Sequence, residues 1–161
     1  MRSDNEAKLA LNKYADTVRR ICFVHFKNLH DTEDVFQDVF LKYILRDKPF
    51  ESDAHEKAWF IRVAINACKD VLKSFFRKKV ISIDDLLEDP PCKGDENREV
   101  LDAVIRMAEK YRVVIYLFYY EGYSAIEIAA ILKKKENTVY TWLARARTQL
   151  KADLGGELFE E

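Results

Sequence analysis

Basic and hydroxyl-bearing side chains gather near the end of the chain, between residues 133 and 151. Six lysines and arginines stand there against one acid, Glu136, so the segment carries a net charge of +5. Cationic groups interleaved with hydroxyls can contact phosphate oxygens and reach the edges of bases. The chemistry that this segment predicts is nucleic-acid binding, by residues that include Lys133, Lys134, Lys135, Thr138, Tyr140, Thr141 and Arg145.

Two helices must position these side chains. Gly122 predicts the end of a preceding helix, because glycine adopts the left-handed cap conformation at little cost. Ser124 and Glu127 have the spacing of a capping box, in which each side chain bonds a backbone N–H at a helix start. The first helix is expected to bury Ile128, Ala129 and Leu132. The second helix, from Asn137 or Thr138, is expected to bury Val139, Leu143, Ala146 and Leu150, with Trp142 at the edge.

A helix, a basic turn from Lys133 to Glu136 and a second helix together indicate a helix-turn-helix. In that motif the second helix enters a DNA major groove. The alternative interpretation is an antiparallel helix pair with a solvated basic edge.

An acidic face is predicted on an earlier helix, which Asp31 is expected to cap. Its apolar face holds Val35, Phe36, Val39, Phe40 and Tyr43. The opposite face combines polar groups with leucines, namely Asp34, Gln37, Asp38, Leu41, Lys42 and Leu45. Leucines set among carboxylates suggest a docking surface for a partner with basic groups and apolar grooves. Two exposed leucines are also unremarkable on any surface, so a solvated face is the alternative.

A third helix is expected from about Ala54 to Arg77. Its polar face carries Trp59, Arg62, Asn66, Lys69, Asp70, Lys73 and Arg77. Single-stranded nucleic acid needs such a surface, because cations follow the phosphates while a base stacks on an aromatic ring. The alternative is that Trp59 packs on the preceding loop, for example on Phe50.

The composition of the 161 residues favours an all-α protein. Hydrophobic residues make up 48% of the chain, enough for packed cores, and glycine and proline are scarce. The formal net charge is −1, so nucleic-acid binding must come from local patches. The odd number and wide spacing of Cys22, Cys68 and Cys92 predict reduced thiols in a cytoplasmic protein, without a metal site. We expect no signal peptide and no membrane span.

A change in composition divides the chain. Residues 81–97 hold six acids against Lys93, and their prolines and glycine forbid a continuous helix. The expected organisation is a helical domain over residues 1–79, an acidic linker over 80–97 and a second helical domain over 98–161. Further helices are expected from about Glu6 to Leu29, from Arg98 and from Tyr111 to Glu121.

Three blocks of this chain resemble the bacterial sigma-70 sigma factors, specifically the small extracytoplasmic-function group. They are DTEDVFQDVFLKYI (31–44), AWFIRVAINACKDVLKS (58–74), and EGYSAIEIAAIL with ENTVYTWLARARTQLK (121–132 and 136–151). The resemblance covers nearly the whole chain, with the blocks in the family's order. It implies a promoter-specificity factor that binds core RNA polymerase and directs transcription initiation, and that is not an enzyme and needs no cofactor or small-molecule substrate.

The resemblance also implies roles for the predicted surfaces. The acidic helix would dock on the polymerase clamp helices through Asp34, Gln37, Asp38 and Leu41. The third helix and the loop before it would bind the −10 element as single-stranded DNA, through Trp59, Arg62, Asn66, Lys69, Asp70 and Lys73. The helix-turn-helix would read the −35 duplex, and its domain would dock on the polymerase flap. The family usually has an anti-sigma factor, which would cover the docking faces.

This sequence departs from the family at several positions. Lys133 and Asn137 stand where glycine is usual, Trp142 where arginine is usual, and Met107-Ala108 where Leu-Pro is usual. The −35 sequence therefore does not transfer from a relative. Two other functions fit parts of the pattern: a polymerase-independent helix-turn-helix regulator, and a helical adaptor that binds an acidic protein.

Overall fold

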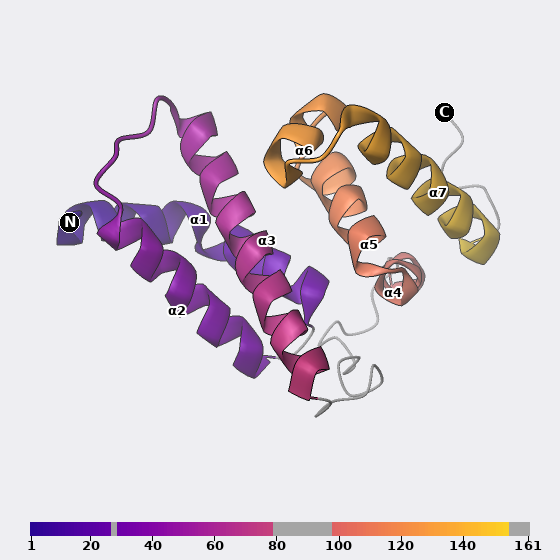
Figure 1. Cartoon of the computed structure of the whole chain (residues 1–161), viewed down its shortest axis with the longest axis horizontal. Helices are drawn as coiled ribbons and strands as arrows, with labels where there is room; N and C mark the ends of the chain where they lie inside the picture. The colour runs from indigo at the N-terminus through magenta and orange to yellow at the C-terminus, as the bar shows by residue number, and fades with distance from the viewer. Residues whose placement is uncertain (27–28, 79–97, 155–161) are drawn as a thin grey trace. The chain divides into compact units, whose positions relative to one another are not determined.

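The computed structural model describes residues 1–26, 29–78 and 98–154, which form two compact units. One unit contains α1 (Asp4–His25), α2 (Leu29–Leu45) and α3 (Asp53–Lys78). The other contains α4 (Arg98–Arg106), α5 (Glu109–Ile115), the π-helical turn η2 (Tyr116–Tyr120), α6 (Ala125–Leu132) and α7 (Glu136–Leu154) (Figure 1). The described part of the chain is helical without strands, as the sequence predicts. The expected acidic linker lies outside the described residues.

The first unit packs its three helices pairwise around Phe60 of α3. The Phe60 ring stacks on Tyr14 of α1, with ring centroids 4.6 Å apart, and lies 5.3 Å from Phe40 of α2. The predicted apolar face of α2, and buried residues of α3 such as Phe60, Ile61 and Ala64, supply this core. The helical period of the sequence therefore fixes which faces remain outside.

Two helix ends in this unit differ from expectation. The prediction that Asp31 caps α2 is wrong, because α2 begins at Leu29 and places Asp31 in its first turn. A carboxylate there still favours the helix through its dipole. The first helix is shifted toward the N-terminus. It begins after Ser3, whose hydroxyl accepts the Glu6 N–H at 3.2 Å, and ends at His25.

In the second unit α7 packs against α4, α5 and α6. Its inward face buries Val139, Leu143, Ala146 and Leu150, as predicted. The short α6 is rotated relative to expectation, since Ile131 is buried and Leu132 only half-buried. Ala108 has extended backbone (φ −57°, ψ 149°), so α4 and α5 are separate helices although the family's usual proline is absent at this position.

The predicted single helix from Tyr111 to Glu121 is instead α5 followed by a π-turn. The Glu121 N–H reaches back five residues to the Tyr116 carbonyl, at 3.1 Å. Gly122 follows with φ +79°, the left-handed conformation expected of it. The helix therefore ends where predicted, but with one residue more in its last turn.

Candidate nucleic-acid interface

The helix-turn-helix of the second unit begins at the predicted capping box. The Ser124 N–H donates to the Glu127 carboxylate at 3.0 Å, and the Glu127 N–H donates to the Ser124 hydroxyl at 3.1 Å. These bonds fix the start of α6. Its end is fixed by Lys133, which adopts φ +55°, and the Lys134 N–H then donates to the Ala129 carbonyl at 3.0 Å. The turn is therefore tight although a lysine stands where the family usually has glycine.

The side chains predicted to bind duplex DNA lie on the exposed side of this motif. Lys133, Lys134 and Lys135 are exposed in the turn. Along α7, Thr138 is half-buried, whereas Tyr140, Thr141 and Arg145 are exposed. The buried and exposed faces of α7 separate cleanly, so these groups can approach a duplex together.

Arg147 of α7 has a structural contact that the sequence did not indicate. Its Nε donates to the Tyr119 hydroxyl at 2.7 Å, and its guanidinium lies 5.1 Å from the Phe118 ring centroid. The bond links α7 to the π-turn across 28 positions. No local pattern signals such a contact, because it depends on how the two elements pack.

The basic stripe of α3 is present, with Asn66 and Lys73 exposed and Arg62 and Lys69 half-buried. Trp59 is half-buried and packs edge-on against Phe50, with ring centroids 5.7 Å apart. The packing that was the alternative interpretation of Trp59 is therefore confirmed. Its ring also lies 6.1 Å from Tyr43, so it belongs to an aromatic cluster of Tyr43, Phe50, Trp59 and Phe60.

Burial raises the pKa of Tyr43 in this cluster, and the carboxylate of Glu56 raises it further. The Tyr43 hydroxyl lies 3.5 Å from that carboxylate. A neutral phenol therefore anchors the start of α3 to α2. The loop between α2 and α3, residues 46–52, therefore adjoins the basic face of α3 that is the candidate surface for the −10 element.

Asp70 lies at the margin of the basic stripe. It lines a groove between α2 and α3 together with Asp34, Val35, Asp38, Ala67 and Val71. Three carboxylates thus surround an apolar floor. A carboxylate in that setting repels phosphate, so of the six predicted −10 residues Asp70 fits DNA least well and fits a cationic partner better.

The acidic face of α2 borders this groove. Asp34, Gln37 and Asp38 are exposed, and Leu41 keeps 54% of its surface accessible. Asp38 is paired with Lys42 at 3.1 Å, but both groups are half exposed, so the pair contributes little to stability. The polymerase-binding candidates therefore form one continuous surface that the fold does not itself use.

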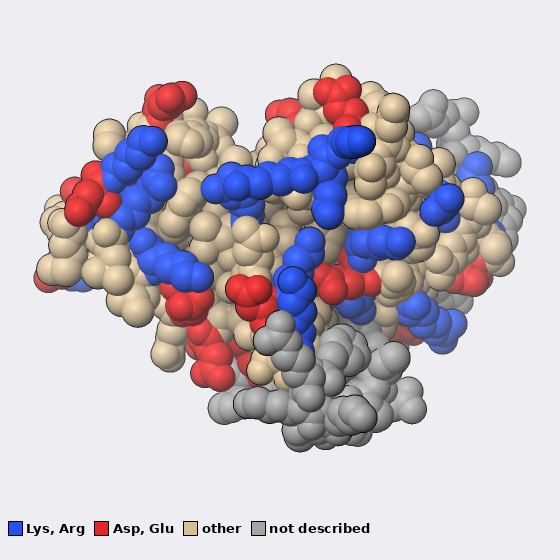
Figure 2. Space-filling model, viewed as in Figure 1, with Lys and Arg blue, Asp and Glu red and all other residues tan. Residues whose placement is uncertain are grey.

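Charge is local in both units. On the face in view, Figure 2 shows Lys and Arg interspersed with Asp and Glu over each unit. Among the described residues, no group of three His, Cys, Asp or Glu side chains could hold a metal ion. None of the described helices is both long and apolar enough to cross a membrane.

Comparison with known families gives two matches, in chain order. Residues 10–79 match Sigma-70 region 2, and residues 97–150 match Sigma-70, region 4. The chain is 24% identical over 158 residues to the ECF RNA polymerase sigma factor SigW of Bacillus subtilis, covering 88% of this chain and 84% of SigW. It is 27% identical over 142 residues to RNA polymerase sigma factor SigV of the same organism, covering 86% and 84%.

Solved structures show the same fold. The sigma factor RpoE, in complex with the anti-sigma factor NepR from Bartonella quintana, superposes with a TM-score of 0.78 at 20% identity, covering 93% of this chain and 97% of that one. CnrH, in complex with the cytosolic domain of CnrY, gives a TM-score of 0.65 at 21% identity, covering 96% and 91%.

Proposed function

This chain belongs to the extracytoplasmic-function group of the sigma-70 RNA polymerase sigma factors, and from that premise we propose how its parts divide the work of a promoter-specificity factor. Residues 1–79 form the domain that docks on core polymerase and holds the −10 element. Residues 98–161 form the domain that reads the −35 duplex, and residues 80–97 link the two. The role is recognition and positioning, so the chain itself needs no catalytic group.

One observation carries the proposal: the two family matches fall one on each helical unit. The region 2 match covers most of α1 and all of α2 and α3, and the region 4 match covers α4 to most of α7. A polymerase-independent regulator would use the second unit alone. It would leave the exposed acidic face of α2 without a purpose.

The docking surface suits a polymerase partner. Asp34, Asp38 and Asp70 rim the apolar floor made by Val35, Ala67 and Val71. A partner helix with basic and aliphatic side chains, such as the clamp helices, would satisfy both features at once. Leu41 extends the apolar part of this surface and Gln37 its polar part.

The DNA surfaces need that partner. With a net charge of −1, the free chain gains little from phosphate attraction, and separating bases costs a few kcal/mol. Core polymerase supplies the missing phosphate contacts. Arg62, Asn66, Lys69 and Lys73 then face the opened −10 strand, while Arg145, Thr141 and the turn lysines face the −35 duplex.

The exposed α2 face is also a suitable binding site for a protein inhibitor. RpoE and CnrH were each solved in a complex, RpoE with an anti-sigma factor. We propose that this chain has such a partner, that it covers the α2 face, and that the whole system operates in the cytoplasm with the polymerase.

The test is co-elution with purified core RNA polymerase in gel filtration. Wild type and Asp16→Lys, a matched charge reversal on the exposed face of α1, should both co-elute in stoichiometric amount. Asp38→Lys should bind at least about tenfold more weakly, because a cation would face the basic partner. Clean separation of the wild type from an active core, with tight duplex binding by the free chain, would favour the independent regulator.

A further inference from the structure

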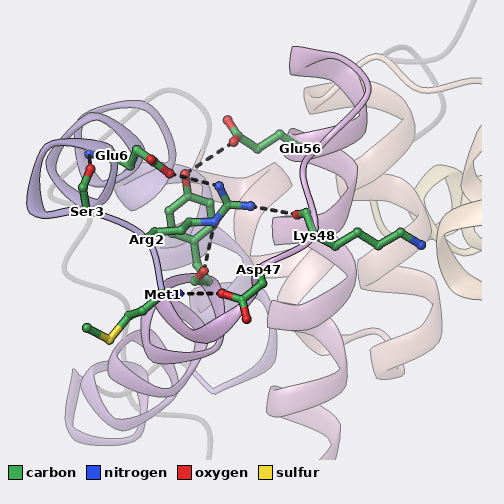
Figure 3. Close-up of polar contacts among 8 residues, drawn as sticks. Met1, Arg2, Ser3, Glu6, Asp47, Lys48 and Glu56 are labelled. Carbon is green, nitrogen blue, oxygen red and sulfur yellow. Dashed lines mark hydrogen bonds and ion pairs between the residues drawn. The ribbon is translucent and has the colours of Figure 1, made fainter.

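The N-terminal residues are bonded to the end of α2 and to the loop that follows it (Figure 3). The Arg2 backbone N–H donates to the Ile44 carbonyl at 2.9 Å. The Arg2 side chain donates through Nε to the Tyr43 carbonyl at 3.2 Å and through Nη2 to the Lys48 carbonyl at 3.0 Å. One residue thus joins the last turn of α2 to the loop between Arg46 and Ser52.

These bonds give hydrogen-bond donors to backbone carbonyls at the C-terminal end of α2. The last carbonyls of a helix lack intrahelical partners and carry partial negative charge. A guanidinium offers five donors in a rigid fork, so it can bond a helix carbonyl and a loop carbonyl at the same time. The Arg2 side chain is only 13% exposed and also pairs with Glu6 at 3.2 Å. The Met1 ammonium contacts Asp47, but both groups are largely exposed, so Arg2 is the main anchor.

The same guanidinium reaches the aromatic cluster. Its central carbon lies 4.5 Å from the Tyr43 ring centroid and 5.1 Å from that of Phe50. Phe50 is parallel to Tyr43 within 7° and meets Trp59 edge-on. Arg46 approaches Phe50 as well, at 4.6 Å. A continuous set of contacts therefore runs from Arg2 through Phe50 to Trp59.

The far end of the loop is tied independently of Arg2. The His55 N–H donates to the Ser52 hydroxyl at 3.1 Å, and the Glu51 N–H donates to His55 Nδ1, also at 3.1 Å. Bonds to His55 of α3 therefore hold residues 51 and 52. Within residues 47–50, Arg2 bonds the Lys48 carbonyl, and the Phe50 ring is contacted by Arg2 and Arg46 as well as by the Tyr43, His55 and Trp59 rings.

We propose that Arg2 is a positioning residue for single-stranded −10 DNA. It holds the loop so that Phe50 and Trp59 are presented together beside the α3 stripe. This inference rests on the proposed function of that stripe and deepens it. Arg2 need not touch DNA, because it acts through the loop.

The first test uses the free protein, with any purification tag at the C-terminus. In a Trp142→Phe background Trp59 is the one tryptophan left in the sequence. Arg2→Ala should make Trp59 fluorescence more accessible to acrylamide, because the ring loses its fixed neighbour Phe50. Glu6→Gln removes the ion pair with α1 but none of the loop contacts, so its quenching should equal that of the parent.

The second test uses the polymerase complex without the Trp142 change. A promoter is first selected from a random-sequence duplex library with wild-type holoenzyme. Opening is then followed by permanganate reactivity of thymines. Arg2→Ala should slow opening about tenfold, the effect expected from losing the charge-assisted hydrogen bond to the Lys48 carbonyl of the loop. Co-elution with core and initial duplex binding should be unchanged, and Glu6→Gln should open at the wild-type rate.

Unchanged quenching or unchanged opening in Arg2→Ala would overturn the proposal, as would an equal defect in Glu6→Gln. Equal losses of core binding and opening would also overturn it, because they indicate general damage to the fold. If Arg2→Ala loses cooperative thermal unfolding, Arg2→Lys replaces it under the same criteria, since lysine cannot bond both carbonyls with one fork. Wild-type holoenzyme that forms but opens no promoter would contradict the proposed function instead, and the quenching result would still decide whether Arg2 holds the loop.

Discussion

Arg145 is an exposed cation on the outer face of α7, and the described contacts give it no part in holding the second unit together. Arg145→Glu should therefore leave thermal unfolding within about 0.5 kcal/mol of wild type. Holoenzyme binding to −35 duplex should weaken about tenfold or more, and the dependence of log affinity on log salt should lose about one unit of slope. Filter binding over a salt series measures both quantities.

Lys151→Glu is the matched control for Arg145, with the same charge change on the last turns of α7. It should weaken binding less, because Lys151 lies to one side of the outer face. Equal affinity of wild type and Arg145→Glu for the duplex would contradict the DNA-reading role of α7.

Asn66 gives a cleaner test of the −10 surface than Trp59 does. Trp59 packs in the aromatic cluster, so replacing it disturbs the loop, whereas Asn66 is exposed. Asn66→Ala should reduce permanganate reactivity of the melted region several-fold, through loss of hydrogen bonds to an opened base, and leave binding to core unchanged. Ser74→Ala, an exposed position on the same helix, should open promoters like wild type. Normal footprints in Asn66→Ala would remove that residue from the site.

Tyr14 should make the first unit sensitive to alkali. Burial and a hydrogen bond to Glu56 raise the pKa of Tyr14 above its ordinary value of about 10. Above about pH 10 the unfolded chain loses a proton that the folded chain keeps, so the free energy of unfolding falls as pH rises. Urea unfolding between about pH 9 and about pH 11 should show this decline, and Tyr14→Phe should make it shallower. A slope unaffected by Tyr14→Phe would contradict the assignment.

At the scale of elements, two residues with left-handed backbone, Gly122 and Lys133, flank α6. The conformational free energy of that backbone differs between glycine and lysine. Gly122 has φ +79° with open space where a Cβ would stand, so Gly122→Ala costs backbone energy without a clash, about 1–2 kcal/mol. Lys133 already carries a side chain at φ +55°. Lys133→Gly should therefore stabilise the second unit, by up to about 1 kcal/mol, and still weaken duplex binding by removing a cation. Thermal unfolding and filter binding of both variants check this pair; destabilisation by Lys133→Gly would contradict the strain at that position.

Helical period and cap chemistry made much of the fold predictable. Val139, Leu143, Ala146 and Leu150 recur at the spacing of one α-helical face, and Ser124 with Glu127 forms a local cap, so each follows from residues a few positions apart. The π-turn at Tyr116 adds a residue without a sequence signal of its own. The start of α2 at Leu29 was missed because Asp31 suits the first turn as well as the cap.

The surfaces that could be predicted each lie on a single helix or turn. The contacts that could not be predicted join residues far apart in the sequence. Wheel positions gave the exposed acids of α2 and the exposed groups of α7. They did not give the bonds from Arg2 to Tyr43 and Lys48, or from Arg147 to Tyr119, which span 41, 46 and 28 positions. They also placed Asp70 with the basic stripe, although its neighbours across the groove, Asp34 and Asp38, come from another helix. Such contacts depend on packing, which period alone does not specify.

At the scale of the whole molecule, each unit has its own hydrophobic core. Buried groups such as Val18, Ile21 and Phe60 belong to the first unit, and Met107, Leu143 and Leu150 to the second. The whole chain carries a formal net charge of −1, so we expect phosphate attraction alone to give the free protein little affinity for DNA. Promoter recognition then depends on presenting two weak DNA contacts together with two polymerase contacts on one chain.

Cutting the chain between the units tests that dependence. A protease site placed within residues 80–97 should give two fragments that keep their helical circular dichroism and unfold independently, because each has a core. Covalent linkage raises the effective concentration of the second contact once the first has formed. The cut protein should therefore need about 100-fold or more higher concentration than the uncut protein to give the same promoter opening. Uncut protein carrying the site is the control, measured by permanganate reactivity over a concentration series. Equal opening by cut and uncut protein at the same concentration would mean that one unit suffices, and loss of helicity in either fragment would mean that the units do not fold separately.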